Sequence, residues 1–323
     1  MNNEANVILV YLSVDRFDSV YRQRMDQIAG GREIICTTDR NEIEKIIPRI
    51  EICIGGVPPD LFIKMPRLGW VQTWAAGVDW LMAHPELKDS PVKITNSSGI
   101  HREQITEHIF ALILSHRRQF PFAFANQKKH EWKKADSSEL SVIAGKTMLI
   151  VGYGAIGEQC AKAALGFGMK VIGVKRHADT NRDGIRIETV DKLHKLLCEA
   201  DYVVNILPHT NDTHGLFGKN EFTLMKNSAI YVNVGRGLTT DEDALINALN
   251  TGEISAALLD VTAVEPLSKD SPLWDMENVI ITPHYAGMRP EYSDLAMNIT
   301  LENLDRYNRG AELINLVDKN AGY

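Results

Sequence analysis

The chain has 323 residues, of which 44% are hydrophobic and 24% charged, and its formal net charge is −7. This length suits two domains of ordinary size, and the composition excludes an intrinsically disordered chain. The negative charge repels phosphate backbones, and no run of about 18 uncharged apolar residues occurs. We therefore expect neither nucleic acid nor a membrane as a partner.

The beginning of the chain and its cysteines indicate a cytoplasmic protein. The first residues lack the basic segment of a signal peptide and lead directly into an apolar stretch that starts at Val7. The four cysteines lie far apart and form no C-x-x-C pair, so neither a zinc site nor a redox pair is indicated. We expect reduced thiols, a cytoplasmic location and no bound metal.

Short apolar runs alternate with helical patterns along the first third of the chain, which is typical of βαβ units around a parallel sheet. A long helical stretch follows, from about Arg102 to Trp132, and Pro121 should kink or interrupt it. The strands predicted in this first third cover residues 6–12, 33–37, 52–55, 70–74 and 93–96.

The next region holds six further strand candidates, the number that a complete dinucleotide-binding sheet needs. A helix near 292–309 and a strand-like run at 313–317 end the chain. We predict a Rossmann-type doubly wound parallel sheet in a domain of residues 99–289. It would be inserted into a smaller, flavodoxin-like α/β substrate domain made of residues 1–98 and 290–323. The six strand candidates cover residues 147–151, 170–174, 201–207, 229–234, 256–260 and 279–282.

A glycine-rich turn with the pattern G-x-G-x-x-G joins the first of these strands to a helix. Gly152 permits the tight turn, Gly154 lets the backbone approach a pyrophosphate, and Gly157 lets the helix pack closely on the strand. The helix N-terminus offers unpaired N–H groups to the anion. The residues predicted to bind a dinucleotide here are Gly152, Tyr153, Gly154, Ala155, Ile156 and Gly157.

The end of the following strand selects the coenzyme. An acidic residue there accepts a hydrogen bond from the ribose 2′-hydroxyl of NAD, whereas a basic residue accommodates the 2′-phosphate of NADP. Lys175 and Arg176 occupy this place, and the first acid is Asp179. We predict NADP as the coenzyme; NAD is the alternative if the basic pair is only a solvated surface feature.

Three later strand ends carry Arg236, Glu265 and His284. The planar guanidinium of Arg236 suits a carboxylate or a polarised carbonyl oxygen. Imidazole is the natural proton donor near neutral pH, and a carboxylate beside it stabilises the charged form. Each residue alone could serve as a helix cap, a solvated loop acid or a turn histidine. Together, behind a dinucleotide motif, they predict one catalytic crevice.

On these motifs the chain resembles the D-isomer-specific 2-hydroxyacid dehydrogenases, and within them the NADP-using glyoxylate/hydroxypyruvate-type reductases. The resemblance implies a two-domain oxidoreductase, usually a homodimer, that transfers a hydride between NADP(H) and a small 2-oxo or D-2-hydroxy acid in the interdomain cleft. The segments that carry it are residues 75–79, 107–108, 151–157, 205–208, 234–237, 260–267, 273–274 and 278–287.

The resemblance also implies roles for individual residues. Arg236 would bind the substrate carboxylate and polarise the 2-keto oxygen, while backbone amides around Ala76 and Gly77 would hold the same carboxylate. His284 would be the acid/base and Glu265 its partner. Further coenzyme contacts are implied for Leu207, Pro208, Thr213, Val234, Gly235, Arg236, Asp260, His284 and Gly287.

Trp132 resembles an interface tryptophan of some reductases in the family. Residues near 53–57, together with Tyr285 and Met288, would line the pocket for the substrate side chain.

Two other interpretations stay open. One is an NAD-dependent D-lactate-type or phosphoglycerate-type dehydrogenase. The other is a cofactor-sensing protein, like the transcriptional corepressors that share this fold, although no sequence feature favours it. Glu265 argues against the formate dehydrogenase branch, which lacks the acidic partner. Turnover of glyoxylate, hydroxypyruvate or phenylpyruvate with NADPH would eliminate the pure sensor.

Overall fold

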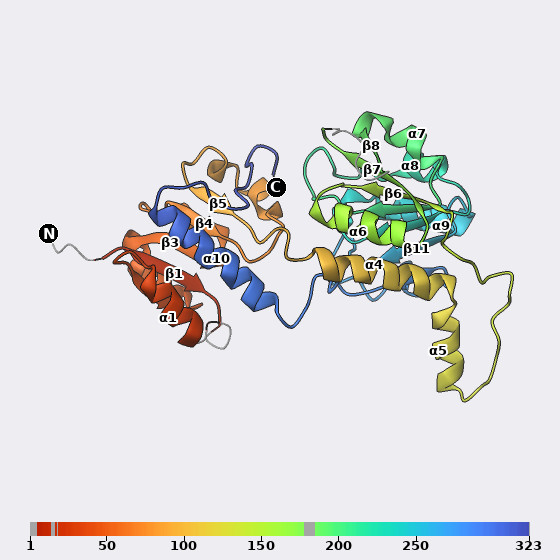
Figure 1. Ribbon diagram of the computed structural model, residues 1–323, viewed down its shortest axis with the longest axis horizontal. Helices are drawn as coiled ribbons and strands as arrows, with labels where there is room; N and C mark the ends of the chain where they lie inside the picture. The colour runs from red at the N-terminus through yellow and green to blue at the C-terminus, as the bar shows by residue number, and fades with distance from the viewer. Residues whose placement is uncertain (1–4, 14–16, 18, 178–184, 323) are drawn as a thin grey trace. The chain divides into compact units, whose positions relative to one another are not determined.

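The computed structural model describes residues 5–13, 17, 19–177 and 185–322. The chain divides into two compact units (Figure 1): Met1–Ile100 with Arg289–Tyr323, and His101–Met288. Each unit is built on one parallel sheet, so the predicted α/β fold class with two sheets is confirmed. None of the helices in the described residues is both long enough and apolar enough to span a membrane.

The first unit contains a five-stranded sheet with the order β2-β1-β3-β4-β5, and all neighbouring strands are parallel. Its strands are almost continuously apolar and buried, as expected where helices cover both faces of a parallel sheet. The strands are β1 (Val7–Tyr11), β2 (Glu33–Cys36), β3 (Ile50–Gly55), β4 (Trp70–Gln72) and β5 (Lys93–Thr95).

Helices from both ends of the chain cover this sheet. The helix α10 (Tyr292–Asn308) places Met297 and Leu304 in one buried cluster with Met25 of α1 (Ser19–Gln27). The C-terminal segment therefore belongs to the same unit as the N-terminus, as Figure 1 shows. A second cluster covers the other face with residues of the remaining elements: α2 (Arg40–Ile46), η2 (Ile47–Arg49), α3 (Pro59–Phe62), η3 (Asp79–Ala83) and η4 (Pro85–Leu87).

The second unit contains a seven-stranded parallel sheet with the order β12-β11-β10-β9-β6-β7-β8. Its first strand in the chain, β6, lies between β7 and β9, so the chain builds the sheet first to one side and then to the other. Such a reversal of strand order is where doubly wound sheets bind their ligands. The strands are β6 (Thr147–Val151), β7 (Lys170–Lys175), β8 (Arg186–Thr189), β9 (Tyr202–Asn205), β10 (Ile230–Asn233), β11 (Ala256–Leu259) and β12 (Val279–Ile281).

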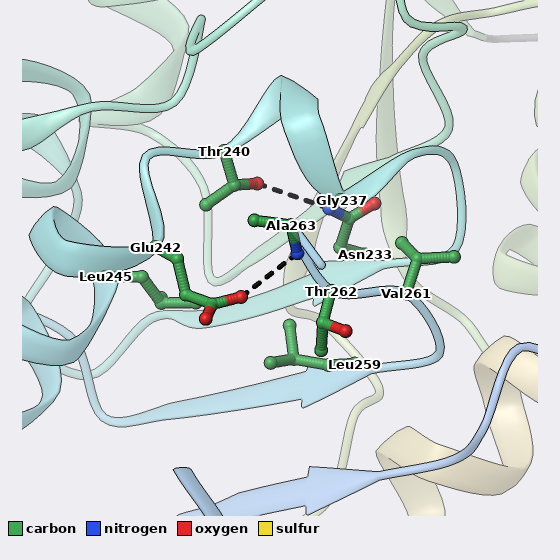
Figure 2. Close-up of a pocket in the computed structure, with 9 residues that line it drawn as sticks. All are labelled: Asn233, Gly237, Thr240, Glu242, Leu245, Leu259, Val261, Thr262 and Ala263. Carbon is green, nitrogen blue, oxygen red and sulfur yellow. Dashed lines mark hydrogen bonds between the residues drawn. The ribbon is translucent and has the colours of Figure 1, made fainter. Parts of the chain in front are cut away.

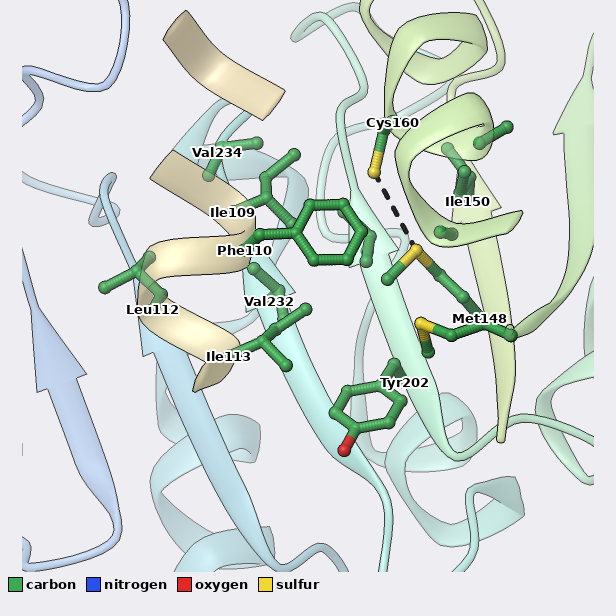
Figure 3. Packing of buried hydrophobic residues seen from close by; sticks show 14 of the residues in the cluster. Ile109, Phe110, Leu112, Ile113, Met148, Ile150, Cys160, Tyr202, Val232 and Val234 are labelled. Carbon is green, nitrogen blue, oxygen red and sulfur yellow. Dashed lines mark hydrogen bonds between the residues drawn. The ribbon is translucent and has the colours of Figure 1, made fainter. Parts of the chain in front are cut away.

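Two helical layers enclose the second sheet. On one face, α4 (Arg102–Arg117) and α6 (Ala155–Gly166) pack on β6, β9 and β10 through a large apolar cluster, part of which Figure 3 shows. A second cluster fills the space between the sheet and the helices of the other face. The elements that follow α6 outside the sheet are η5 (Val190–Lys192), α7 (Leu193–Leu197), α8 (Lys219–Leu224), η6 (Gly237–Thr239), α9 (Glu242–Thr251) and η7 (Pro272–Trp274).

The structure differs from the sequence prediction at two strands. The short edge strand β8 is absent from the prediction, because only Ile187 of its four residues is buried and the others are polar. The prediction of a strand over 313–317 is wrong: only an isolated bridge joins Leu316 to Thr95. Asn315 has a φ of 55°, which breaks the extended conformation that a strand requires.

The predicted long helix is interrupted, as expected near Pro121, but the break lies just before that residue. The helix α4 ends at Arg117, Gln119 adopts a φ of 55°, and α5 (Phe120–Lys128) then begins. Trp132 is not helical; it follows α5 and is 98% exposed. In Figure 1, α5 and the stretch 129–139 stand away from the layers of the second unit as an arm.

Candidate active site

The glycine-rich turn links the central strand β6 to helix α6. Gly152 has a φ of 99°, and a Cβ atom there would lie 2.8 Å from the backbone carbon of Ile206, so only glycine fits. A Cβ atom on Gly157 would lie 3.1 Å from the carbonyl oxygen of Gly152. These close approaches bring the carboxyl ends of β6 and β9 together at the point where the strand order reverses.

The same turn leaves room for a ligand. A Cβ atom on Gly154 would meet no atom within 4 Å. The helix α6 begins at Ala155, and its first intrahelical hydrogen bond runs from the N–H of Glu158 to the oxygen of Gly154. The N–H groups of the first helical turn therefore have no intrahelical acceptor and carry the positive end of the helix dipole. This open, electropositive place fits the pyrophosphate of a dinucleotide.

Two basic residues lie at the end of β7, beside the glycine-rich turn. The N–H groups of Gly152 and Tyr153 both donate to the oxygen of Val174, which ties this strand end to the turn. Lys175 is the last residue of β7, and the Arg176 guanidinium lies 3.7 Å from the carboxylate of Asp212. No acid precedes them at the strand end, and Asp179 lies outside the described residues.

The loop after β9 is closed by its own side chains. The Thr213 hydroxyl donates to the oxygen of Pro208 at 2.7 Å and accepts from the N–H of Thr210 at 2.8 Å. The N–H of Leu207 donates to the Asn205 side chain at 3.1 Å. This loop therefore has a defined shape beside the glycine-rich turn, and Thr213 serves as its internal brace.

A buried polar network holds the backbone of Arg236. The oxygen of Arg236 accepts hydrogen bonds from the Thr239 hydroxyl at 2.6 Å and the Asn233 amide at 3.2 Å. The Asn205 amide donates to Thr239 at 2.7 Å and to the Tyr231 hydroxyl at 2.8 Å. All four supporting side chains are buried, and burial raises the pKa of Tyr231, which keeps its hydroxyl neutral. These hydrogen bonds therefore hold the backbone of Arg236 rigidly, just after the end of β10.

Two glycines allow the neighbouring strand-end loops to touch. A Cβ atom on Gly235 would lie 2.5 Å from the oxygen of Leu207, and one on Gly237 would lie 1.9 Å from the oxygen of Thr262. Figure 2 shows the small pocket at this contact, where the Glu242 carboxylate accepts from the N–H of Ala263 at 3.0 Å. The loops after β9, β10 and β11 therefore pack as one unit.

Glu265 and His284, 19 residues apart, meet in the structure. One oxygen of Glu265 lies 2.6 Å from Nδ1 of His284, and the other accepts from the N–H of Thr262 at 3.2 Å. Both side chains are partly exposed. An imidazole held at Nδ1 by a carboxylate presents its Nε2 to a ligand and can give or take a proton there.

The buried carboxylate of Asp260 organises the turn that carries His284. It accepts from the N–H groups of Tyr285 and Ala286, both at 3.1 Å, and from the Thr282 hydroxyl at 2.7 Å. The N–H of His284 also donates to the backbone oxygen of Asp260 at 2.8 Å. Both oxygens of the Asp260 carboxylate therefore accept hydrogen bonds from residues next to His284.

The remaining predicted site residues lie in different places. Gly287 is in the second unit, where its oxygen accepts a hydrogen bond from the Gln104 side chain at 3.1 Å. A Cβ atom on Gly287 would point toward the ring of His101. Val234 is buried directly after β10. Ala76 and Gly77 belong to the first unit, in the bend after β4, where the Asn96 amide donates to the Ala76 oxygen at 2.8 Å. No group of three or more potential metal ligands occurs among the described residues.

Several residues that stabilise these loops by hydrogen bonds are not among the residues predicted from the sequence. Asn233 and Asn205 occupy the last positions of their strands, and Glu242 begins α9. A polar residue that ends an otherwise apolar buried strand is a usable signal, because a buried amide needs hydrogen-bond partners. Their partners, such as Thr239 and Ala263, cannot be read from local spacing.

Comparison with known protein families gives one match over more than half of the chain. Residues 110–286 match the family described as D-isomer specific 2-hydroxyacid dehydrogenase, NAD binding domain. Among related sequences, glyoxylate/hydroxypyruvate reductase B of Klebsiella pneumoniae (strain 342) is 38% identical over 235 residues, 72% of each chain. Glyoxylate reductase of Korarchaeum cryptofilum (strain OPF8) is 32% identical over 292 residues, 85% of each chain.

Solved structures with the same fold cover almost the whole chain. A D-isomer specific 2-hydroxyacid dehydrogenase from Xanthobacter autotrophicus Py2, in complex with NADPH and MES, has a TM-score of 0.84 and 28% identity, and the match covers 99% of this chain and 100% of that one. An NADPH-dependent glyoxylate/hydroxypyruvate reductase from Sinorhizobium meliloti, in complex with NADP and sulfate, has a TM-score of 0.83 and 29% identity over 98% and 100% of the two chains.

Proposed function

Because the chain belongs to the D-isomer-specific 2-hydroxyacid dehydrogenase family, we propose that it reduces small 2-oxo acids to D-2-hydroxy acids with NADPH. The observation that carries the proposal is the Glu265–His284 pair, which provides a proton donor in the unit that also holds the dinucleotide turn. Relatives that are 38% identical over 235 residues and 32% identical over 292 residues are named glyoxylate/hydroxypyruvate reductase and glyoxylate reductase, which supports the substrate class.

The glycine-rich turn would hold the coenzyme. Gly154 and the first N–H groups of α6, from Ala155 to Gly157, would bind the pyrophosphate, and Tyr153 would flank it. Leu207 and Pro208 would lie against the adenosine. When bound, the coenzyme supplies the hydride that reduces the keto carbon.

Three side chains of the second unit would do the remaining chemistry. Arg236 binds the substrate carboxylate and stabilises the negative charge that develops on the keto oxygen. His284, protonated and held at Nδ1 by Glu265, donates a proton from Nε2 to that oxygen. Backbone amides of Ala76 and Gly77 are proposed as further carboxylate donors. Because hydrogen bonds hold the backbone of Arg236, its guanidinium can bind the substrate without reorganisation of the loop.

The preference for NADPH over NADH is proposed from the end of β7. Lys175 and Arg176 offer positive charge where an acid would otherwise bind the ribose 2′-hydroxyl. The 3.7 Å approach of Arg176 to Asp212 is compatible with this role, since a phosphate with almost two charges competes well with one exposed carboxylate. The Xanthobacter and Sinorhizobium structures, solved with NADPH and NADP, support the assignment.

We propose that the arm of α5 and the stretch 129–139 joins two copies of the chain. Phe120, Phe122 and Phe124 are 43%, 38% and 56% exposed, and Trp132 is 98% exposed. So many exposed aromatic side chains on one projecting segment mark an interaction surface. A second copy offers the same surface, which is the arrangement that a two-fold symmetric dimer needs. Multi-angle light scattering on the protein and on Phe124→Asp tests this: the variant should be monomeric.

The location that we propose is the cytoplasm. All four cysteines lie in the described part of the chain and are free thiols, two of them buried. Reduced thiols persist in a compartment such as the cytoplasm. Cell fractionation of the native host with an antibody to the protein tests the location.

Loss of NADPH absorbance with glyoxylate, hydroxypyruvate and phenylpyruvate tests the activity. Wild-type protein should turn over at least one of them, and His284→Gln should lose about 10²- to 10⁴-fold in rate. Its affinity for NADPH, measured by fluorescence, should remain close to wild type. His194→Gln, an exposed histidine paired with Glu221, is the control and should keep full activity. Tight NADPH binding without any turnover would instead favour the sensor.

A further inference from the structure

We propose that His108, on helix α4, is a positioning residue that fixes the turn carrying His284. The inference rests on the proposed function, because the exact place of His284 matters only if its imidazole donates a proton to substrate. His108 lies inside the second unit, one helical turn from Ile105 and Leu112 on the buried face of α4. A polar residue within such an apolar stripe requires a specific partner.

His108 contacts Thr282, the residue that follows β12 and precedes the turn that carries His284. Nε2 of His108 lies 2.9 Å from the hydroxyl oxygen of Thr282 and 3.5 Å from a carboxylate oxygen of Asp260. Its ring also meets Tyr285 edge to face, with 5.3 Å between the ring centroids. The His108 side chain is 14% exposed and the Asp260 side chain 2% exposed, so these contacts are largely shielded from water.

The hydrogen-bond chain has one direction. The Thr282 hydroxyl has a single hydrogen, which it donates to Asp260 at 2.7 Å. His108 must therefore donate from Nε2 to the Thr282 oxygen. Burial lowers the pKa of His108, although the Asp260 charge opposes this, and a lowered pKa favours the neutral imidazole. A neutral imidazole that donates from Nε2 carries its single ring proton there. The chain runs from His108 through Thr282 to the carboxylate of Asp260.

That carboxylate in turn fixes the residues directly after His284. Asp260 accepts from the N–H groups of Tyr285 and Ala286. His284 itself has a φ of 52°, a left-handed conformation that costs a residue with a side chain free energy and persists only where its surroundings impose it. His108 supplies that constraint from α4, a helix that carries none of the proposed catalytic residues.

Two substitutions at His108 separate its hydrogen bond from its bulk. His108→Phe keeps a flat ring against Tyr285 but cannot donate, whereas His108→Gln keeps an N–H donor at a similar reach. His108→Phe should lower kcat with glyoxylate by about 10- to 100-fold, the scale expected for a misplaced catalytic group. The KM for NADPH should stay within twofold, and His108→Gln should return kcat to within threefold of wild type.

His116→Phe is the matched control, because His116 lies on the same helix, eight positions later, and is also largely buried. Its Nδ1 has no hydrogen-bond partner in the described structure, so the same substitution breaks no bond at that atom. This variant should keep wild-type kcat. A His108→Phe enzyme with kcat within twofold of wild type, or a folded His108→Gln enzyme as slow as His108→Phe, overturns the proposal.

A double-mutant cycle tests the chain as a unit. If His108 acts through Thr282, then Thr282→Val should cause a similar loss of kcat, and the variant with both changes should be no slower than the slower single variant. Losses that multiply would show two independent effects and contradict the proposal. If His108→Phe does not fold, Thr282→Val still tests the hydrogen-bond chain. This variant should lower kcat without changing the KM for NADPH, and an unchanged kcat overturns the proposal.

Deuterium uptake gives a readout that does not depend on activity. In protein without coenzyme, the amides of residues 284–288 should exchange at least tenfold faster in His108→Phe than in wild type. His108→Gln should restore slow exchange, and His116→Phe should not change it. Unchanged exchange in His108→Phe overturns the inference. If no 2-oxo acid is reduced by wild-type protein, the proposed function fails, while this measurement still decides whether His108 fixes the turn.

Discussion

The carboxylate of Glu265 lies 2.6 Å from Nδ1 of the His284 imidazole. The backbone N–H of Thr262 holds the second oxygen of the same carboxylate, so Glu265 cannot swing away without losing a hydrogen bond. An imidazole that is held at Nδ1 by a carboxylate turns its other ring nitrogen, Nε2, away from that carboxylate. This arrangement suits a proton donor for reduction.

Glu265→Gln should lower kcat for reduction of the 2-oxo acid. The amide can still bind Nδ1 of His284, but it brings no negative charge to the imidazole that exchanges a proton with substrate. We expect a loss on the order of tenfold, limited by the partial exposure of the pair. Steady-state kinetics with glyoxylate measures it, and the KM for NADPH is the internal control. An unchanged kcat would contradict the pairing.

Arg236→Lys should be nearly as damaging as Arg236→Ala. Lysine keeps the positive charge but cannot present two parallel N–H groups to a carboxylate. The loss of a charged hydrogen bond, about 1.5–3 kcal/mol, corresponds to roughly 10- to 100-fold in kcat/KM for the 2-oxo acid. Steady-state kinetics with glyoxylate measures this, and NADPH affinity is the internal control. A lysine variant of near-normal efficiency would show that Arg236 acts only as a remote charge.

Gly237→Ala should destabilise the protein and reduce its activity together. The new Cβ atom would lie 1.9 Å from the oxygen of Thr262, so the loops that carry Arg236 and Glu265 must separate. We expect a loss of about 1–3 kcal/mol in unfolding free energy, measured by urea denaturation. Gly166→Ala is the control, because a Cβ atom at this last position of α6 meets nothing within 4 Å. That variant should be equally or more stable than wild type.

Lys175→Asp combined with Arg176→Ala should reverse the coenzyme preference. The variant lacks donors for the 2′-phosphate and gains an acceptor for the 2′-hydroxyl. One or two charge-assisted bonds imply a wild-type preference for NADPH of roughly 10- to 10³-fold, expressed mainly in the KM for coenzyme. Kinetics with NADPH and NADH at two salt concentrations measure it, since screening should reduce the wild-type preference. Wild-type protein that prefers NADH would refute the assignment.

The stability of the protein should fall below neutral pH, in part because of His116. Burial lowers its pKa from the ordinary 6.5 to about 4. The unfolded chain therefore binds a proton between these values while the folded protein does not, so acid favours unfolding. Protonation of His116 in the unfolded chain lowers the free energy of unfolding by up to about 3 kcal/mol as the pH falls from 7 to 4. His116→Phe should show a shallower fall in denaturant midpoint over this range; an identical slope would exclude His116 as a source.

The fold class could be predicted from the sequence because its signals are local. Continuous apolar runs such as 147–151 indicate strands of a parallel sheet covered on both faces, and G-x-G-x-x-G shows where one strand turns into a helix. Parallel strands end at one edge of their sheet, which is why Arg236, Glu265 and His284 could be grouped from their positions at predicted strand ends alone. Their catalytic roles and the choice of NADP remain predictions.

Tertiary structure alone decided how these residues are held. Nothing in the local sequence joins His108 to Thr282, 174 residues away, or requires glycine at 237 because the backbone of Thr262 passes against it. The edge strand β8 and the irregular run 313–317 depend in the same way on what packs beside them. Hydrophobic periodicity records how far a segment is buried, whereas a specific hydrogen bond or steric contact depends on which distant segment arrives there.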